Sequence, residues 1–240
     1  MEPYDQTQVT TPRGAPAVVL SRPGTSDLSV AGATMRLWGK LEDEYHLATL
    51  HVSGTFVDVG AHIGSVTLAV LLDNPEVRAI CVEPLAENIE VIETTMATNG
   101  VAERVTVLQA AMGPGKSADI AYDYDETDYL RTNRYIGGIE RTAPTHMQTV
   151  TVPTVSLAKL VAMAGGSVDV MKLDCEGCEW HALRSTAVRH IRTIIGEWHG
   201  HAVHPHTEGA IRLREIIGKT HDVEVIDDLG GTGVFRAVRR

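Results

Sequence analysis

The residues with the clearest chemical meaning form a turn of sequence DVGAHIG, which runs from Asp58 to Gly64 between two apolar segments. Residues 55–57 before the turn are typical of a buried strand. Residues 65–72 after it are typical of a helix that begins with a hydroxyl cap. A strand that leads into a helix through glycines brings the free N–H groups of the helix close to a ligand. The turn therefore predicts a site for a nucleotide-like cofactor.

The spacing of the glycines indicates which cofactor binds there. The dinucleotide fingerprint G-x-G-x-x-G needs three glycines, and this turn offers only Gly60 and Gly64. The carboxylate of Asp58 would not help to hold a pyrophosphate, but it suits a cofactor that carries a cationic amino group. S-adenosylmethionine carries both an ammonium and a sulfonium group, so we expect this cofactor.

A second acidic residue, Glu83, ends the next apolar run, and Pro84 after it cannot continue a strand ladder. A carboxylate at this strand tip accepts hydrogen bonds from both ribose hydroxyls in dinucleotide folds. The alternative is that Glu83 is only a solvated strand end and that the glycines form only a tight turn. Together the signals favour a cofactor site. The residues expected to bind the cofactor are Asp58, Gly60, Ala61, His62, Gly64, Ser65, Glu83 and Gln109.

A third stretch, residues 172–179 with the sequence KLDCEGCE, fits the pattern K-x-D-x-E-G-x-E. It follows the glycine turn, the Glu-Pro pair and two asparagines, Asn88 and Asn99. In this order and spacing, residues 40–200 resemble the FkbM family of S-adenosylmethionine-dependent methyltransferases.

The resemblance implies an α/β fold of class I, the Rossmann-like methyltransferase fold. Its sheet has seven strands, is mostly parallel with an antiparallel last strand, and carries helices on both faces. The resemblance also implies methyl transfer, usually to a hydroxyl of a sugar, a polyketide or another small molecule of natural product biosynthesis. One position departs from the family, since His62 stands where relatives usually carry Asn. How the methionine end of the cofactor is held is therefore open.

Composition and charge narrow the class of protein. A chain of 240 residues with 43% hydrophobic residues can build one α/β domain with a sizeable core. A formal net charge of −10 opposes a phosphate backbone, so we expect a small neutral or cationic acceptor and no nucleic acid. The chain shows neither a secretory leader nor an apolar stretch long enough for a membrane span, so we expect a cytoplasmic protein. The oligomeric state is open, a homodimer being one option.

The pattern divides the chain into an N-terminal arm, residues 1–36, and a methyltransferase domain, residues 37–240. The periodicity predicts a first helix over residues 37–51. It is poor from about residue 114 to 150, where an acidic stretch with several tyrosines follows the third strand. Because long loops in compact domains usually carry function, we expect a lid over the acceptor there, with a solvated acidic loop as the alternative.

The other predicted elements alternate as a doubly wound sheet requires. Predicted helices cover residues 85–99, 156–164, 179–188 and 207–219. Predicted strands cover residues 77–83, 105–109, 168–173, 191–198, 221–226 and 233–238, and the last two are expected to form an antiparallel hairpin.

Three polar residues stand where the predicted fourth and fifth strands end, at the edge of the sheet beyond which open parallel sheets bind ligands. The residue types alone do not show whether the three converge. They are Asp174, Glu197 and His199. A hydroxyl acceptor has a high pKa, so either a general base takes its proton or a metal ion lowers its pKa. These side chains could act as the base or as ligands of Mg²⁺ or Mn²⁺, and we favour direct base or proximity catalysis.

Neighbouring residues have open roles. The carboxylates of Asp174 and Glu176 could instead cap the helix that follows the fourth strand. Lys172 could bond to the site or pair with a nearby carboxylate.

The cysteines are too few for a disulfide scaffold. Cys81 falls in a predicted buried strand, and Cys175 and Cys178 form a C-x-x-C motif at positions that the family leaves variable. We expect these two cysteines to serve only in packing. The alternative is a zinc site completed by histidines after the fifth strand. Those histidines are His199, His201, His204 and His206.

Two other functions compete with methyl transfer. A nicotinamide-dependent oxidoreductase would need the third glycine of its fingerprint, which is missing. A catalytically inactive cofactor-binding module would be expected to lose the polar groups at the fourth and fifth strand ends, and this chain keeps them.

Overall fold

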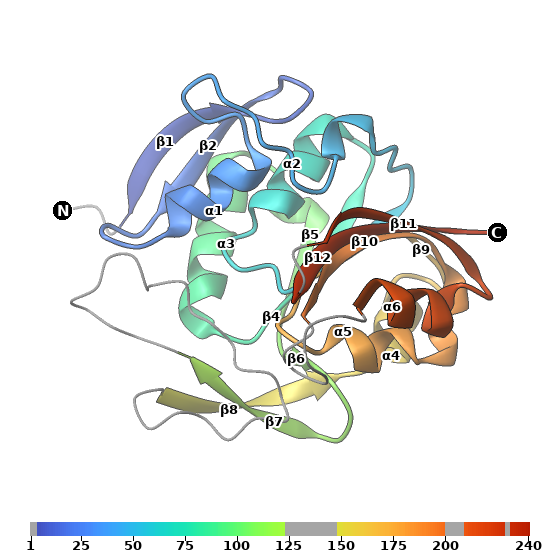
Figure 1. The fold of residues 1–240 in the computed structure, drawn as a ribbon. Coiled ribbons are helices and arrows are strands. Elements are labelled where there is room, and N and C mark those ends of the chain that lie inside the picture. The colour runs from blue at the N-terminus through green and yellow to red at the C-terminus, as the bar shows by residue number, and fades with distance from the viewer. Residues whose placement is uncertain (1–3, 123–147, 200–208, 229–230) are drawn as a thin grey trace.

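A seven-stranded sheet forms the centre of the molecule (Figure 1), in the computed structural model, which describes residues 4–122, 148–199, 209–228 and 231–240. The strand order is β11-β12-β10-β9-β3-β4-β5. The strands are β3 (Thr55–Val59), β4 (Arg78–Glu83), β5 (Val105–Gln109), β9 (Val168–Leu173), β10 (Ile191–His199), β11 (His221–Asp228) and β12 (Thr232–Arg239). Every pair from β10 to β5 is parallel, and β12 lies antiparallel between β10 and β11. The predicted sheet and its antiparallel last strand are confirmed.

Alternation along the strands produces two hydrophobic cores, one on each face of the sheet. On β3, Phe56 belongs to one core and Val57 to the other, and both are fully buried. Val170 and Met171 divide in the same way on β9. Burying one such side chain contributes about 1.5–3 kcal/mol to folding. Strands that are apolar on both faces must therefore be covered by helices on both sides.

The helices supply that cover. They are α1 (Asp27–Thr34), α2 (Ser65–Asp73), α3 (Ala86–Thr98), α4 (Leu157–Met163), α5 (Glu179–Leu183) and α6 (Gly209–Ile217). The first three contribute to the core around Phe56, and the last three to the core around Val57. Gly100, with a φ of +69°, lies just after α3 as predicted. The helix predicted over 179–188 needs correction, because it divides into α5 and a 3-10 helix, η3 (Thr186–His190).

The segment expected as an N-terminal arm packs against the helices α2 and α3. β1 (Asp5–Thr10) and β2 (Pro16–Ser21) form an antiparallel hairpin, and α1 follows it (Figure 1). Asn99 at the end of α3 joins the hairpin, because its side chain accepts a hydrogen bond from the N–H of Val18 at 2.9 Å and donates one to the carbonyl of Val18 at 2.8 Å. One asparagine of the family pattern thus holds the hairpin. The predicted domain boundary at residue 36 stays a prediction.

The helix predicted over residues 37–51 is wrong. The segment is a loop that contains one 3-10 turn, η1 (Leu47–Thr49). Its backbone has positive φ at Trp38, Asp43 and His46. A right-handed helix cannot include such residues, and the carboxylate of Asp43 instead accepts the backbone N–H groups of Leu47 and Ala48. Charged and apolar residues in this loop mimic a helical period without forming a helix.

A small second sheet adds to the domain in the region of the expected lid. It has the order β6-β8-β7 and consists of β6 (Ala111–Met112), β7 (Ser117–Tyr122) and β8 (Gln148–Val155). The rest of the predicted lid lies outside the described residues, as do His201, His204 and His206. Within the described parts of the chain, no helix combines the length and apolar character that crossing a membrane requires.

Candidate active site

A cavity of about 330 Å³ lies at the carboxyl ends of β3, β4, β9 and β10. This is the edge of the sheet where open α/β folds bind their ligands. The glycine turn, α1 and the loop before β3 form part of the wall, and Met112 and Ile120 of the small sheet form another part. The cavity is therefore built from both the central sheet and the segments added to it.

The glycine turn needs its glycines for two different reasons. Gly60 has a φ of +79°, and a Cβ there would lie 1.7 Å from the carbonyl oxygen of Asp174. Gly64, with a φ of +80°, is the N-cap of α2, and its Cβ would lie 2.9 Å from Met96 Cε. The predicted hydroxyl cap at Ser65 is therefore wrong, because α2 begins on glycine with no side-chain cap.

Glu83 is buried rather than solvated, so the alternative of an exposed strand end is wrong. Its carboxylate accepts the backbone N–H of His62 at 2.9 Å, the N–H of Leu85 at 3.1 Å and the amide of Asn88 at 3.0 Å. Burial raises the pKa of Glu83 to about 7, although these three hydrogen bonds act in the opposite direction. Glu83 thus fixes the glycine turn, and it also lines the cavity.

His62 lines the cavity and has a left-handed backbone, with a φ of +51°. Histidine, with Asn and Asp, is among the residues other than glycine that adopt this conformation most readily, so His62 fits the turn. Neither ring nitrogen of His62 finds a hydrogen-bond partner among the described residues. Burial lowers the pKa of His62 to about 4, so the ring is neutral and offers one donor and one acceptor.

The expected cofactor residues do not all reach the cavity. Gly60, Ala61, His62, Ser65 and Glu83 line it. Asp58, Gly64 and Gln109 do not belong to its lining, and Asp58 is fully buried behind it. Gln109 donates a hydrogen bond to the carbonyl of Pro84 at 3.4 Å.

Asp58 is instead a partner of Lys172. The two residues are paired in the register of β3 and β9, so their side chains leave the sheet on the same face. Lys172 Nζ lies 3.6 Å from Asp58 and 3.2 Å from Asp174, and it donates a hydrogen bond to the Gly60 carbonyl at 2.7 Å. The two carboxylates outweigh burial and raise the pKa of Lys172 above its usual range. Of the two roles left open for Lys172, the structure shows the pairing with nearby carboxylates. Its hydrogen bond to Gly60 also joins the glycine turn to β9.

Two residues at the site come from the loop that sequence reasoning took for a helix. Tyr45 is buried and donates its hydroxyl to Asp174 at 2.9 Å. Glu44 lines the cavity, and burial together with Asp174 raises its pKa to about 7. No local pattern predicts these contacts, because Tyr45 and Asp174 are 129 residues apart in the chain.

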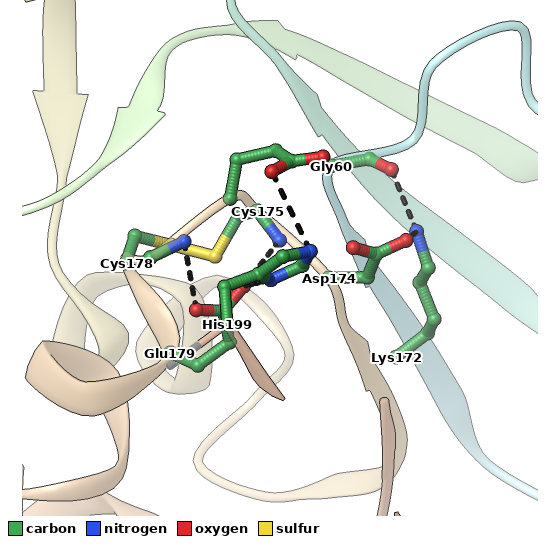
Figure 2. Close-up of a disulfide and its surroundings, with 9 residues drawn as sticks. Gly60, Lys172, Asp174, Cys175, Cys178, Glu179 and His199 are labelled. Carbon is green, nitrogen blue, oxygen red and sulfur yellow. Dashed lines mark hydrogen bonds and ion pairs between the residues drawn. A yellow bond between two sulfur atoms is a disulfide. The ribbon is translucent and has the colours of Figure 1, made fainter. Parts of the chain in front are cut away.

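Glu179 organises the turn between β9 and α5 (Figure 2). Its buried carboxylate accepts the N–H of Cys175 and the N–H of Gly177, each at 2.8 Å, and lies 3.1 Å from Nδ1 of His199. Neither Asp174 nor Glu176 caps α5, whose N-cap is Cys178 with no side-chain cap. The capping alternative is therefore wrong, and the Glu179 carboxylate binds N–H groups of the turn before α5.

His199 is surrounded by carboxylates. Its Nε2 lies 3.4 Å from Glu176 and 3.8 Å from Glu197, while Nδ1 contacts Glu179. Burial alone would lower the pKa of His199, but the hydrogen bond and charge of Glu179, with Glu176 beside it, raise the pKa to about 10. His199 is therefore an imidazolium at neutral pH.

The sequence left open whether the three polar residues at the ends of the fourth and fifth predicted strands converge, and the structure brings them together. Asp174, Glu197 and His199 each offer one ligand atom, and these atoms lie within 4.8 Å of one another. Asp174 stays ionised, because Lys172 outweighs burial and keeps its pKa below the usual value. Burial and the charge of Asp174 raise the pKa of Glu197.

The expectation that Cys175 and Cys178 only pack is wrong, because the two cysteines form a disulfide. Their Cα atoms lie 5.5 Å apart, within the range that a disulfide spans. Two sulfurs bonded to each other are not thiolate ligands, so the zinc alternative is wrong as well. Cys81 is buried in β4, as predicted.

Comparison with protein families identifies the family of the chain that carries this site. The profile described as the methyltransferase FkbM domain matches residues 58–221, more than half of the chain. The chain belongs to this FkbM family. It is an S-adenosylmethionine-dependent methyltransferase, which confirms the predicted resemblance and cofactor and removes the nicotinamide-dependent alternative. No curated protein matches this FkbM chain significantly.

Solved structures similar to this FkbM protein share little sequence with it. A precorrin-6y C5,15-methyltransferase from Geobacter metallireducens GS-15 is 13% identical with a TM-score of 0.47, over 80% of this chain and 83% of that chain. A conserved hypothetical protein from Streptococcus pyogenes is 11% identical with a TM-score of 0.46, and the match covers 81% of this chain and 91% of that chain. TrmK from M. capricolum, solved with S-adenosyl-homocysteine, is 8% identical with a TM-score of 0.45, and the match covers 80% of this chain and 65% of that chain.

Proposed function

We propose that this FkbM enzyme transfers the methyl group of S-adenosylmethionine to a hydroxyl oxygen of a small molecule. The observation that carries this proposal is the convergence of Asp174, Glu197 and His199 beside the cavity. A hydroxyl must lose its proton when it is methylated, so an oxygen acceptor needs groups of this kind. An inactive cofactor-binding module would not need them.

The residues of the cavity fit the cofactor. Glu83 offers a carboxylate at the strand tip for the two ribose hydroxyls. The ring of His62, whose nitrogens have no partner among the described residues, offers a hydrogen-bond donor to the carboxylate of the methionine end. When bound, the cofactor supplies a methyl group on a sulfonium, so the protein has to align an oxygen with it and accept a proton.

The charges around the cavity suggest how the proton is handled. Asp174 is ionised and can orient an acceptor hydroxyl by accepting its hydrogen bond. Glu176 has a pKa of about 7 because of its burial, and the pKa of Glu197 is also raised, so these carboxylates suit a general base near neutral pH. His199, already protonated at that pH, contributes a positive charge that holds both carboxylates in place.

A divalent cation held by Asp174, Glu197 and His199 is the second mechanism. Glu179 on Nδ1 would orient the imidazole, as carboxylates behind metal-bound histidines do. The cation would have to displace the proton of His199, whose pKa of about 10 implies a cost of about 4 kcal/mol at pH 7. We therefore favour the carboxylate base.

Chelation separates the two mechanisms. We expect the enzyme to keep its turnover after exhaustive treatment with EDTA and removal of the chelate, because the carboxylate base needs no metal. The assay is the rate of S-adenosyl-homocysteine release with and without added Mg²⁺ or Mn²⁺. Activity that disappears with EDTA and returns with either cation would establish the metal mechanism instead.

The small sheet supports a role for the inserted segment in acceptor choice. Met112 and Ile120 contribute apolar walls to the cavity, and the segment that joins β7 to β8 was predicted to be a lid. The lid and a cytoplasmic location stay predictions. The formal charge of −10 favours a small neutral or cationic acceptor over nucleic acid.

The proposal is tested by offering the enzyme S-adenosylmethionine and a panel of small hydroxylated molecules, such as sugars and phenols, with matched amines. We expect release of S-adenosyl-homocysteine with the hydroxylated compounds, and an O-methyl group in the product by NMR. Methyl groups found only on nitrogen would contradict the oxygen specificity. Cofactor binding without any transfer would favour the inactive module.

A further inference from the structure

The disulfide encloses the turn that carries the site. Cys175 directly follows Asp174, and Cys178 directly precedes Glu179. Both cysteines line the cavity, where Cys175 is partly exposed and Cys178 is buried. The bond therefore joins the two ends of a turn whose flanking residues both act at the site.

The enclosed turn has a backbone that needs support. Glu176 has a φ of +56° and Gly177 a φ of +111°. A residue other than glycine in the left-handed region costs of order 1–3 kcal/mol and persists only when its surroundings fix it. The disulfide and the Glu179 carboxylate both fix this turn, because the N–H groups that Glu179 accepts belong to Cys175 and Gly177.

We propose that the Cys175–Cys178 disulfide is a reversible modification site that a dithiol reductant opens, and that opening it slows methyl transfer by loosening the turn around Glu179. The inference rests on the proposed function for its activity readout. It assigns to the C-x-x-C motif a role beyond packing.

The chemistry is thiol–disulfide exchange. A thiolate of the reductant attacks the Sγ of Cys175, the more exposed of the two. A mixed disulfide forms, the bond between the two cysteines breaks, and Cys178 leaves with the electron pair and takes up a proton. The second thiol of the reductant then displaces Cys175, which also takes up a proton. The protein gains two electrons and two protons, and the reductant leaves as its own disulfide.

Opening the bond acts on the site through Glu179. Once the turn is free to relax, the N–H groups of Cys175 and Gly177 no longer hold the carboxylate in one position, and the contact between Glu179 and His199 at 3.1 Å loosens. A shift of about 1 Å in a catalytic group can cost ~10²-fold in rate. Glu83 and His62 belong to other segments, so cofactor affinity should change little.

The experiment compares the oxidised enzyme with enzyme reduced by dithiothreitol. Thiols are counted by alkylation and mass spectrometry, turnover is measured, S-adenosyl-homocysteine binding is titrated by calorimetry, and amide exchange is followed over residues 174–180. On reduction we expect two new thiols, a kcat lower by about tenfold or more, nearly unchanged affinity, and faster exchange at Cys175 and Gly177. Re-oxidation should restore all of these properties.

Two variants serve as controls. Cys81→Ala removes the remaining cysteine and should keep the full response to dithiothreitol, whereas Cys175→Ser combined with Cys178→Ser should not respond and should match reduced wild type. Equal turnover and equal amide exchange in both redox states would overturn the proposal. If neither state transfers methyl groups, the proposed function fails, and amide exchange alone then decides whether the disulfide holds the turn.

Discussion

Asp174→Asn should lower kcat by about 10²–10³-fold while the affinity for S-adenosyl-homocysteine stays close to that of wild type. Asp174 is the one carboxylate of the trio that stays ionised with a lowered pKa. Its charge can accept the hydrogen bond of the acceptor hydroxyl and stabilise the positive charge that grows on the oxygen as the new bond forms. Removing one preorganised interaction of this kind from an active site typically costs 10²–10³-fold in rate.

The asparagine variant is chosen because it preserves shape. An amide oxygen can still accept the hydroxyl of Tyr45 and contact Lys172, so the turn between β9 and α5 should survive. Steady-state kinetics and calorimetry provide the measurements. Asp5→Asn, which changes an exposed carboxylate on β1, is the matched control and should behave as wild type. A variant that loses cofactor binding together with turnover would show that Asp174 acts only as the structural partner of Lys172.

The sequence was sufficient for the parts of the fold that depend on local pattern. The apolar runs at Phe56 and Val170 predicted central parallel strands, because residues buried on both faces leave no polar alternation. The rule that ligands bind at the carboxyl edge of such a sheet then placed the glycine turn and the acidic residues at the strand ends in one site. The same rule placed Asp174 and Glu197 on one edge of the sheet, but it left open whether they converge with His199.

The sequence was insufficient where a role depends on register or on a distant partner. Asp58 was expected at the cofactor, but it pairs with Lys172 because β3 and β9 align the two residues. Glu44 and Tyr45 were missed because a loop with positive φ at several residues carries them to the cavity. Both cases depend on contacts between segments more than a hundred residues apart, which periodicity cannot reveal.

Glu83→Ala should weaken the binding of S-adenosylmethionine and S-adenosyl-homocysteine by at least about a hundredfold. Two hydrogen bonds from the ribose to a charged carboxylate contribute about 1.5–3 kcal/mol each. The variant also leaves the N–H of His62 and the amide of Asn88 without their acceptor, which should loosen the glycine turn. Glu93→Ala removes an exposed carboxylate from α3 and is the matched control. Unchanged affinity by calorimetry would contradict the assignment of Glu83 to the cofactor.

The pH dependence of binding tests the same residue without disturbing the turn as strongly. Burial raises the pKa of Glu83 to about 7 in the protein without ligand. Ribose hydroxyls donate to the ionised carboxylate, so binding favours the ionised form and lowers this pKa. Affinity for S-adenosyl-homocysteine should therefore rise as the pH increases through 7, and a proton should be released on binding below that pH. Glu83→Gln cannot ionise and should lose this part of the pH dependence. If calorimetry in buffers of different ionisation enthalpy finds the same proton release in both proteins, the titrating group is another carboxylate of the cavity, and Glu83 does not contact the ribose.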